Sequence, residues 1–462
     1  MKTKAIRYYS TNRGLDGVPG IRPFQGTVSF REALLQGQAP DEGLYMPETI
    51  PSLPADSVPA LKGRPYAEAA LLVARAFLEA EIGDGDLRRI VEDSYNYPVP
   101  LEKVEEGLFI LRLDRGPTAS FKDFAARMMA RLMSFLRDPD QRLNVLVATS
   151  GDTGSAVGEA FKGVAGIGVT ILYPRGEVSG RQKKQLDTIG GNVRAISVDG
   201  KFDDCQNLVK QAFADPGLAR FNLTSANSIN FGRILPQIVY YVYAYAQLAE
   251  KGGDIVFSVP SGNFGDALGC EYARRMGLPV RRLIMPTNEN DEFPRFLETG
   301  IYRKVSPSRA SLSNAMNVGH PSNLARFFEL YGGTVDRTGV VHKVPDLEAM
   351  RERIFSVSIS DRETRETIRR VHERYGVILE PHGAVGWRGL EVYRERFAGA
   401  RLCVCLETAH PAKFPDEITD LLGIAPDLPD SMKDLDGRTG EAPVLAADYG
   451  TFKRYLTDHL LT

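Results

Sequence analysis

Cysteine is scarce in this sequence, and its placement does not point to a metal site. The 462 residues include four cysteines, of which only Cys403 and Cys405 lie close together. Both fall in the apolar run 402–406, where alternate residues of a strand point to opposite faces of a sheet. We therefore expect a core strand in a protein of a reducing compartment, without metal ligands.

The sequence also lacks a basic excess and a long hydrophobic run. Its formal net charge is −2, so it offers no surplus of positive charge to neutralise nucleic-acid phosphates. The longest apolar stretch, 234–249, contains Pro236, Gln237 and Gln247 and is too short and too polar to span a membrane. The first ten residues carry charge without the apolar core of a signal peptide. We expect a cytoplasmic protein that has neither nucleic acid nor membrane as a partner.

A chain of this length is expected to fold as two or three domains with cores of their own. Residues 1–98 are rich in glycine and proline turns and hold a short helix, for which Ser29 is a suitable N-cap. In residues 99–425 we expect two α/β subdomains, the smaller at roughly 120–230. Residues 426–462 are acidic and turn-rich, and they should end in one helix and pack on the preceding region.

Apolar runs and helical patterns alternate along the middle of the chain. Strands are predicted at residues 108–113, 144–149, 168–172, 193–198, 254–259, 280–285 and 402–406. Helices are predicted near residues 120–137, 153–163, 204–214, 229–250, 265–276, 362–375 and 383–397. This alternation is typical of an α/β fold with largely parallel sheets. Ligands of such folds bind at the carboxyl ends of strands, so functional loops should directly follow strands.

One lysine stands at the start of a predicted helix. From Phe121 the apolar residues recur at three- and four-residue steps, which predicts a helix with one buried face and Lys122 on its first turn. A cation is poorly placed for the helix dipole there, so its presence needs another reason. Burial or nearby positive potential lowers the pKa of a lysine ammonium and makes the amine a nucleophile for an aldehyde. A surface lysine that starts an ordinary helix is the equally weighted alternative.

The loop 150–156 follows a predicted strand and combines glycines with hydroxyl groups. Ser150, Thr153 and Ser155 offer hydroxyls, and the helix that follows offers free N–H groups. We interpret this loop as a cradle for a substrate carboxylate. The alternative is a turn in which Asp152 or Thr153 caps the helix.

A second loop, 260–269, follows the strand predicted at 254–259 and contains closely spaced glycines. Glycines before a helix form a nest of backbone N–H groups that binds anions. The loop lacks the lysine and serine of a nucleotide P-loop and the spacing of a dinucleotide fingerprint. A compact terminal phosphate is therefore the predicted ligand, and a tight packing turn is the alternative.

The third loop, 407–414, places Thr408 just beyond a predicted strand, where its hydroxyl could meet a ring nitrogen. His410 is either an acid–base group or, as we expect first, a structural residue that holds the loop by a backbone hydrogen bond. A reactive lysine, a carboxylate cradle, a phosphate nest and a hydroxyl for a ring nitrogen are together the parts of a pyridoxal 5′-phosphate site.

The chain carries several longer motifs. They are Val28-Ser-Phe-Arg-Glu-Ala-Leu-Leu, Gly43-Leu-Tyr-Met-Pro, Gly116-Pro-Thr-Ala-Ser-Phe-Lys-Asp-Phe, Ser150-Gly-Asp-Thr-Gly, Tyr173-Pro-Arg-Gly, Thr224-Ser-Ala-Asn-Ser-Ile-Asn, Ser261-Gly-Asn-Phe-Gly, Leu312-Ser-Asn-Ala-Met, Glu380-Pro-His and Thr408-Ala-His-Pro-Ala-Lys. With them nearly the whole chain resembles the threonine synthases, in the branch typified by the yeast and enterobacterial enzymes. The resemblance implies the tryptophan-synthase-β-like α/β fold of fold type II pyridoxal-phosphate enzymes, with two open α/β domains and an additional N-terminal domain.

By this resemblance Lys122 is the catalytic residue and binds the aldehyde of pyridoxal 5′-phosphate covalently. The other residues that it implies for cofactor binding are Asp152, Ser261, Gly262, Asn263, Phe264, Gly265 and Thr408. The residues expected to bind substrate are Ser120, Ser150, Thr153, Gly154, Arg181, Asn227, Ser228 and Arg233. Asp152 stands where many relatives of the wider fold have an asparagine near the phenolic oxygen of the cofactor.

The implied reaction converts O-phospho-L-homoserine and water to L-threonine and phosphate by a β,γ-elimination and replacement, the last step of threonine biosynthesis. Lys122 should remove the Cα proton, and Thr408, as a neutral hydroxyl, should leave the ring nitrogen largely unprotonated. For the substrate phosphate, Arg181 or Arg233 is preferred because arginine binds phosphate bidentately. The basic cluster at 181–184 is otherwise the solvated start of a helix.

Two rival interpretations differ in the chemistry after substrate binding. A dehydratase or phospho-lyase that releases 2-oxobutyrate would use the same cofactor site, and only the placement of water at Cβ separates it from a threonine synthase. The N-terminal segment favours threonine synthase, and the intact lysine and phosphate loop disfavour a non-catalytic binding protein. Monomer and homodimer both stay open, as do the roles of Glu380 and His382.

Overall fold

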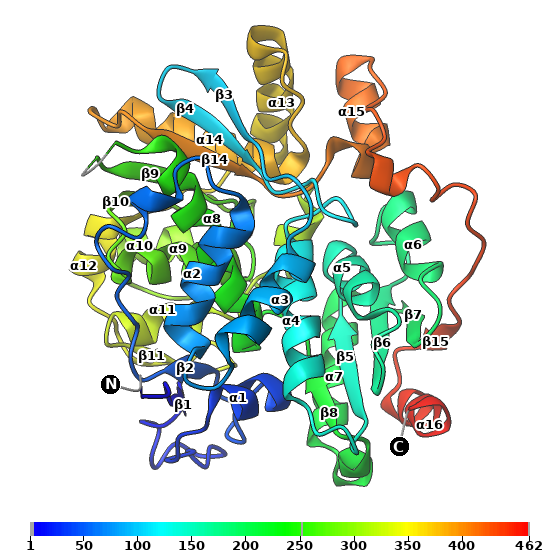
Figure 1. The fold of residues 1–462 in the computed structure, drawn as a ribbon. Helices are drawn as coiled ribbons and strands as arrows, with labels where there is room; N and C mark the ends of the chain where they lie inside the picture. The colour runs from blue at the N-terminus through cyan, green and yellow to red at the C-terminus, as the bar shows by residue number, and fades with distance from the viewer. Residues whose placement is uncertain (1–3, 251–252, 461–462) are drawn as a thin grey trace.

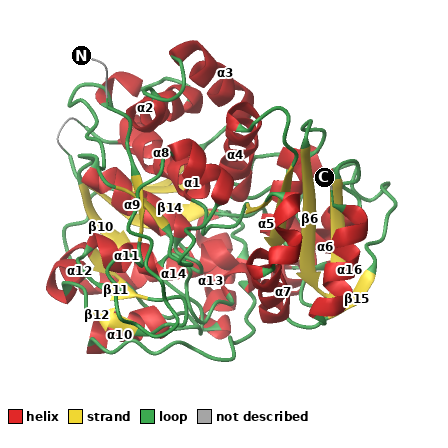
Figure 2. Ribbon diagram, turned by 90° about the horizontal axis from the view of Figure 1, so that it is seen from below, coloured by secondary structure: helices red, strands yellow, loops and turns green. Residues whose placement is uncertain are grey.

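Two sheets flanked by helices form the frame of the molecule (Figure 1). The computed structural model describes residues 4–250 and 253–460. Figure 2 shows the strands of both sheets lying among helices, which is the arrangement that the alternating sequence pattern predicts. The α/β fold expected from the sequence is confirmed.

The larger sheet has six strands in the order β13-β10-β9-β14-β4-β3. Their bounds are β3 (Leu101–Glu105), β4 (Leu108–Arg112), β9 (Ile255–Ser258), β10 (Val280–Ile284), β13 (Ile354–Phe355) and β14 (Cys403–Glu407). Neighbouring strands are parallel except β3 and β4, which form an antiparallel pair at one edge. The helices that follow or cover these strands are α8 (Phe231–Leu248), α9 (Gly265–Arg275), α10 (Glu292–Thr299), α11 (Leu324–Leu330), α12 (Leu347–Arg353), α13 (Asp361–Tyr375) and α14 (Pro381–Arg396).

The smaller sheet has five strands in the order β15-β7-β6-β5-β8, and all of its pairs are parallel. Their bounds are β5 (Leu143–Ala148), β6 (Ile167–Pro174), β7 (Val193–Asp199), β8 (Leu223–Ser225) and β15 (Val444–Ala446). The helices of this lobe are α5 (Asp152–Phe161), α6 (Gly180–Asp187) and α7 (Phe202–Ala214). Strands β5 and β6 are buried along their whole length, as parallel strands covered on both faces require.

The N-terminal part packs on the larger lobe and shares its core. It contains β1 (Tyr8–Ser10), β2 (Tyr45–Pro47), α1 (Phe30–Gln36), α2 (Tyr66–Leu78) and α3 (Asp84–Ser94). Ser29 caps α1 as predicted, in a reciprocal capping box with Glu32. Helix α2 contacts α8, and buried residues of α1, α2 and α8 belong to one hydrophobic cluster.

Helix α4 (Lys122–Leu136) lies at the junction of the lobes, because it contacts α5 on one side and α8 on the other. The segment just before it pairs with the loop after β14 through a bridge between Ser120 and Ala409. The backbone N–H of Phe121 donates to the Thr408 carbonyl at 2.8 Å. The start of α4 is therefore fixed to the carboxyl end of β14.

The C-terminal part ends in one helix, as predicted, and contains other elements that the sequence analysis did not predict. Helix α15 (Pro415–Leu422) precedes the turn-rich segment, β15 adds a fifth strand to the smaller sheet, and α16 (Tyr449–His459) packs on α7 (Figure 1). Phe452 and Leu456 of α16 are buried in one cluster with side chains of α7 and the smaller sheet. The chain thus returns to the smaller lobe at its end.

The elements that the sequence analysis missed are short. Every strand and helix predicted between residues 99 and 425 is present, with bounds shifted by a few residues. The missed helices α3, α6, α10, α11, α12 and α15 have at most eleven residues, and the missed strands such as β8, β11 (Thr334–Val335) and β12 (Val341–Lys343) have two to five. Runs this short carry little periodicity from which to predict them. None of the described helices is long and apolar enough to cross a membrane.

Truncating one side chain of α16 tests whether this helix belongs to the smaller lobe's core. We expect Phe452→Ala to lower the free energy of unfolding by about 3–5 kcal/mol, because it opens a cavity between α16 and α7. Asp458→Ala, on an exposed position of the same helix, should change it little. Urea denaturation of both variants measures this, and equal stability of the two variants would contradict the packing described here.

Candidate active site

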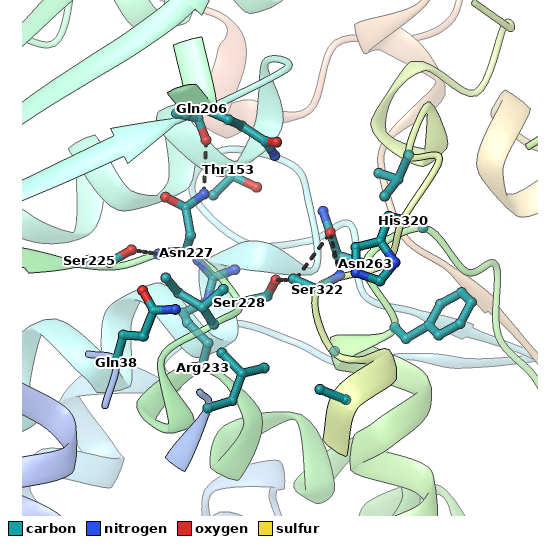
Figure 3. Close-up of a pocket in the computed structure, with 18 of the residues that line it drawn as sticks. Gln38, Thr153, Gln206, Ser225, Asn227, Ser228, Arg233, Asn263, His320 and Ser322 are labelled. Atoms are coloured by element: carbon teal, nitrogen blue, oxygen red, sulfur yellow. Dashed lines mark hydrogen bonds between the residues drawn. The ribbon is translucent and has the colours of Figure 1, made fainter. Parts of the chain in front are cut away.

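A cavity of about 700 Å³ lies where the two lobes and the N-terminal part meet. The loops after β5, β9 and β14 line it together with the first turn of α4 and residues of α8. Its wall thus contains the carboxyl ends of parallel strands from both sheets. Figure 3 shows part of this wall, with Asn227, Ser228 and Arg233 on one side and Asn263, His320 and Ser322 on the other.

Lys122 is the first residue of α4, and its side chain is only 12% exposed. Burial lowers the pKa of its ammonium, and the positive charges of Lys413 and Arg233 act in the same direction. Asp152, whose Oδ2 lies 3.7 Å from the Lys122 Nζ, opposes this shift. The alternative of a surface lysine is therefore wrong, and the amine sits where its neutral, nucleophilic form is favoured.

Asp152 is the first residue of α5, and two further polar groups hold its carboxylate. The ammonium of Lys413 lies 2.7 Å from its Oδ1, and the Gln182 amide donates to the same oxygen at 2.8 Å. Burial alone would raise the pKa of Asp152, but the charges of Lys413 and Lys122 outweigh it and hold the pKa well below the usual range. Asp152 is therefore ionised, and Gly151 rather than Asp152 or Thr153 occupies the N-cap of α5.

The glycine loop after β9 comes close to neighbouring backbone. A Cβ on Gly262 would lie 2.9 Å from the Ala315 carbonyl oxygen, and one on Gly265 would lie 3.0 Å from Gln237 Oε1. Phe264 takes a left-handed conformation with φ 63°, after which Gly265 begins α9. The first N–H groups of a helix lack partners within it, so the start of α9 faces the cavity with positive potential. Such a loop suits a compact phosphate.

Thr408 directly follows β14, and its hydroxyl donates to Glu380 Oε1 at 3.3 Å. Glu380 is fully buried and caps α14 by accepting from the backbone N–H groups of His382 and Gly383. The His382 ring lines the cavity, and its Nε2 accepts from the Ala315 N–H at 3.1 Å. Glu380 thus braces Thr408 and α14, whereas His382 reaches the cavity itself.

His410 has the structural contact that the sequence favours for it. Its Nδ1 accepts a hydrogen bond from the Ala412 N–H at 3.2 Å, and its own backbone N–H donates to the Ala119 carbonyl at 3.0 Å. Burial lowers its pKa to about 4, so the ring is a neutral acceptor at ordinary pH. Ala119, which it helps to hold, has a positive φ of 56° in the turn that leads to Lys122.

Arg233 lies on α8 and is 3% exposed. Its Nη1 donates to the Ala226 carbonyl at 2.8 Å, and its Nε has no partner among the residues that the structure describes. Burial lowers its pKa to about 10, which still leaves it charged at neutral pH. Asn227 and Ser228 precede it on the same wall (Figure 3), so this side of the cavity can receive an anion.

The cavity does not contain every residue that the resemblance implies. Of those residues it is lined by Lys122, Ser150, Asp152, Thr153, Asn227, Ser228, Arg233, Ser261, Gly262, Asn263, Phe264, Gly265 and Thr408. Ser120, Gly154 and Arg181 are not among the described residues that line it. Ser120 and Gly154 are buried in the adjoining turns.

Arg181 lies on α6 instead, a helix that begins in the basic cluster 181–184. Its Nη1 is 3.7 Å from Asp436 Oδ1 of the C-terminal segment, and the neighbouring Lys183 pairs with Asp187 at 2.5 Å. The basic cluster 181–184 is thus the start of a helix, which was the alternative to a phosphate-binding site. Its residues are not among the described residues that line the cavity.

Sequence reasoning missed several polar residues of the site. These are Gln182, Gln237, Asp266, His320 and Lys413. Lys413 ends the motif Thr408-Ala-His-Pro-Ala-Lys, and Asp266 directly follows Gly265. The sequence therefore singled out the segments that contain both residues, but it did not indicate which side chains they contact. No group of three or more possible metal ligands occurs in the described part of the chain.

Comparisons with known proteins agree over most of the chain. Residues 20–95 match the family described as "Threonine synthase N terminus", residues 95–408 "Pyridoxal-phosphate dependent enzyme" and residues 383–456 "Threonine synthase, C-terminal". The threonine synthase of Haemophilus influenzae is 39% identical, over 93% of this chain and 96% of that protein.

Solved structures show the same likeness in three dimensions. The crystal structure of threonine synthase with bound PLP from Brucella melitensis has a TM-score of 0.88 and 36% identity, covering 99% of this chain and 100% of that one. The yeast threonine synthase structure has a TM-score of 0.86 and 31% identity, covering 98% of both chains.

Removing the cation that pairs with Asp152 tests the electrostatics of the site. We expect Lys413→Met to cost about 3–5 kcal/mol in the free energy of unfolding, because it leaves a buried carboxylate without its partner. The double variant Asp152→Asn, Lys413→Met should lose less than Lys413→Met alone. Lys433→Met removes the lysine of an exposed pair with Asp430 and should change stability little. Equal losses from Lys413→Met and Lys433→Met, measured by urea denaturation, would contradict the buried pair.

Proposed function

The chain belongs to the threonine synthase family and converts O-phospho-L-homoserine and water to L-threonine and phosphate with pyridoxal 5′-phosphate, and from this premise we propose which of its residues carry each part of the reaction. The observation that carries the proposal is the buried amine of Lys122, which lies at the junction of three loops that each follow a parallel strand. Each loop offers a different kind of contact to one flat, phosphorylated cofactor.

The residues around the cavity fit this cofactor. The glycine loop Ser261–Gly265 and the start of α9 would hold its phosphate, since Gly262 and Gly265 leave no space for side chains there. Thr408 would meet the ring nitrogen, and Asp152 would lie by the phenolic oxygen. When bound, pyridoxal phosphate links covalently to an amine and withdraws electrons from the carbon attached to it.

Lys122 is proposed to take the proton from the substrate Cα. A base must be unprotonated before it can accept a proton, and burial favours the neutral amine of Lys122. Asp152 keeps the returning ammonium in place, because its Oδ2 is 3.7 Å away and stays ionised. Lys413 pairs with the other oxygen of Asp152 and offsets part of the negative charge that acts on Lys122.

Arg233, Asn227 and Ser228 are proposed to bind the substrate phosphate. Arg233 is charged and buried, it lines the cavity, and its Nε has no partner among the described residues, which supports a contact with a phosphate oxygen. The hydroxyls of Ser150 and Thr153, at the start of α5, would then bind the substrate carboxylate. Arg181 has a weaker claim, because it lies against the C-terminal segment.

Thr408 is proposed to present a neutral oxygen to the cofactor ring. Its hydroxyl donates to Glu380 Oε1 at 3.3 Å in the structure, and the same proton can turn to an unprotonated ring nitrogen, which is an acceptor. A neutral oxygen stabilises a protonated ring nitrogen far less than a carboxylate would. This supports the expectation of a ring nitrogen that is largely unprotonated.

The domain bounds of the chain, its cellular compartment and its partners are also proposals. We place an N-terminal domain at residues 1–98, a catalytic region at 99–425 and a C-terminal segment at 426–462, and the change of family match at residue 95 supports the first of these boundaries. The four cysteines are all free and buried, which supports a reducing, cytoplasmic setting. Beyond its small-molecule substrate the chain is proposed to act as a monomer or homodimer without nucleic acid, since its net charge is −2.

Replacing the proposed base tests the central assignment. We expect Lys122→Ala to lower the rate of phosphate release from O-phospho-L-homoserine by ~10³-fold or more, because both the amine nucleophile and the base are lost. The same variant should lose the visible absorbance of lysine-bound cofactor. Lys183→Ala, a surface lysine beside the site, is the control and should behave as the unaltered chain. Normal single-turnover release from Lys122→Ala would rule the assignment out.

Comparing two arginines tests the proposed phosphate contact. Arg233→Ala should reduce kcat/KM for O-phospho-L-homoserine by ~30- to 5000-fold, corresponding to about 2–5 kcal/mol for a buried charged contact. Arg181→Ala should change kcat/KM little. A large loss in Arg181→Ala together with a small one in Arg233→Ala would move the phosphate site to α6. Analysis of the product as threonine or 2-oxobutyrate, in the same assays, separates replacement from elimination.

A further inference from the structure

Three buried polar side chains leave atoms unpaired at the floor of the cavity, where α8 packs against α9. Arg233 Nε, Gln237 Oε1 and Asp266 Oδ2 have no hydrogen-bond partner within the described chain. All three residues line the cavity, and Gln237 and Asp266 are 3% and 6% exposed. Buried polar atoms are rarely left unpaired without a reason. These atoms therefore indicate a polar ligand at this end of the cavity.

Helix α8 brings two of these side chains, Arg233 and Gln237, onto one face, and Gln237 and Tyr241 contact the start of α9. Arg233, Gln237 and Tyr241 are four residues apart and so share one face of that helix. Gln237 Oε1 lies against Gly265, where a Cβ would be 3.0 Å away. The Tyr241 hydroxyl lies 2.6 Å from Asp266 Oδ1 and 2.9 Å from the Asp266 carbonyl oxygen. Tyr241 thus holds one carboxyl oxygen of Asp266, and the other stays free.

Asp266 is the second residue of α9 and directly follows the glycine loop. A carboxylate at this place would repel a phosphate bound to the same loop, whereas a carboxylic acid can donate a hydrogen bond to it. Burial raises the pKa of Asp266 to about 7, although the Tyr241 hydrogen bond and the Lys122 charge act to lower it. The acid form is therefore accessible at neutral pH.

The groups that face Asp266 are few and mostly neutral. Lys122 of α4 is the cation that acts on it. Four neutral titratable groups also interact electrostatically with Asp266. They are Tyr66 of α2, Tyr240 and Tyr241 of α8, and Cys270 of α9. The arginines of α9 and β10 are engaged elsewhere: Arg274 and Arg275 with Glu271, Arg281 with Asp254, and Arg282 with the carbonyls of Arg351 and Glu352.

We propose that Asp266 is a phosphate-binding residue that carries a proton on Oδ2 and donates it in a hydrogen bond to a phosphate oxygen, so that binding of the phosphate takes up a proton. The inference rests on the proposed assignment of the glycine loop and Arg233 to phosphate groups. The ligand chemistry is a phosphate dianion, supplied either by the ester of the cofactor or by the substrate and its inorganic product.

The test counts the protons that accompany phosphate binding to the full-length chain. In the first arm, the chain freed of cofactor is titrated by calorimetry with pyridoxine 5′-phosphate, which has no aldehyde and cannot react with Lys122. Buffers of different ionisation enthalpy give the number of protons taken up at about pH 8, above the second phosphate pKa of about 6. Pyridoxine without phosphate is the ligand control. In the second arm, the cofactor-loaded chain is titrated with inorganic phosphate.

We expect the unaltered chain to take up a fraction approaching one proton per phosphate bound, and Asp266→Asn to take up none while still binding. Glu292→Gln is the matched control, because Glu292 is another buried carboxyl whose pKa is raised, to about 8, and it is not among the described residues that line the cavity. It should retain the uptake. Uptake in the first arm assigns Asp266 to the phosphate of the cofactor, and uptake only in the second arm assigns it to the phosphate of the substrate.

A second variant tests the inference independently in case Asp266→Asn does not fold. Tyr241→Phe removes a hydrogen bond that lowers the pKa of Asp266, so the pH at which uptake begins should move upward. Phosphate-dependent binding with the same uptake in the unaltered chain and in Asp266→Asn would overturn this inference alone. Equal binding of pyridoxine 5′-phosphate and pyridoxine, with no phosphate binding in the second arm, would overturn the phosphate assignments on which it rests.

Discussion

The proposed role of Lys122 as a base depends on the balance of the buried charges around it. Lys122 lies beside the carboxylate of Asp152, which by itself would hold the ammonium form. Lys413 binds the other oxygen of Asp152 and offsets its charge. The three residues come from α4, α5 and the loop after β14, so the balance exists only when both lobes are in place. The bridge between Ser120 and Ala409 fixes two of these segments to each other.

The parallel sheets explain why the remaining groups reach the same cavity. Strands β5, β9 and β14 end at its wall, and each is followed by a loop that carries hydroxyls, glycines or a single threonine. Helices α5 and α9 begin at the loops after β5 and β9, so the cavity has positive potential that suits two phosphate groups. An ionised carboxylate next to the start of α9 would oppose that potential. Burial raises the pKa of Asp266 and so favours its neutral acid, which does not reduce the positive potential of the helix start.

The parts of the site that could be predicted are those in which strand, loop and helix follow one another in the chain. Lys122, the glycines at 262 and 265 and Thr408 all stand in such segments, and their chemistry follows from the local sequence and its resemblance to a family. The choice between Arg181 and Arg233 could not be predicted in this way. Both are arginines near a motif, but α6 turns Arg181 toward Asp436, whereas α8 buries Arg233 in the cavity wall. Short elements such as α6 and β8 were missed because they carry little periodicity.

The sequence by itself determined the α/β class, the family and the cofactor, and it predicted Lys122 as the reactive residue, because hydrophobic periodicity and strand–loop–helix motifs are local properties. Only the tertiary structure decided which distant groups meet. It brought Lys413 to Asp152, Tyr241 to Asp266 and the C-terminal strand β15 to the edge of the smaller sheet. The physical reason is that pairing of buried charges and loss of solvent depend on contacts between segments far apart in the chain. Such contacts cannot be predicted from the spacing of residues along the chain.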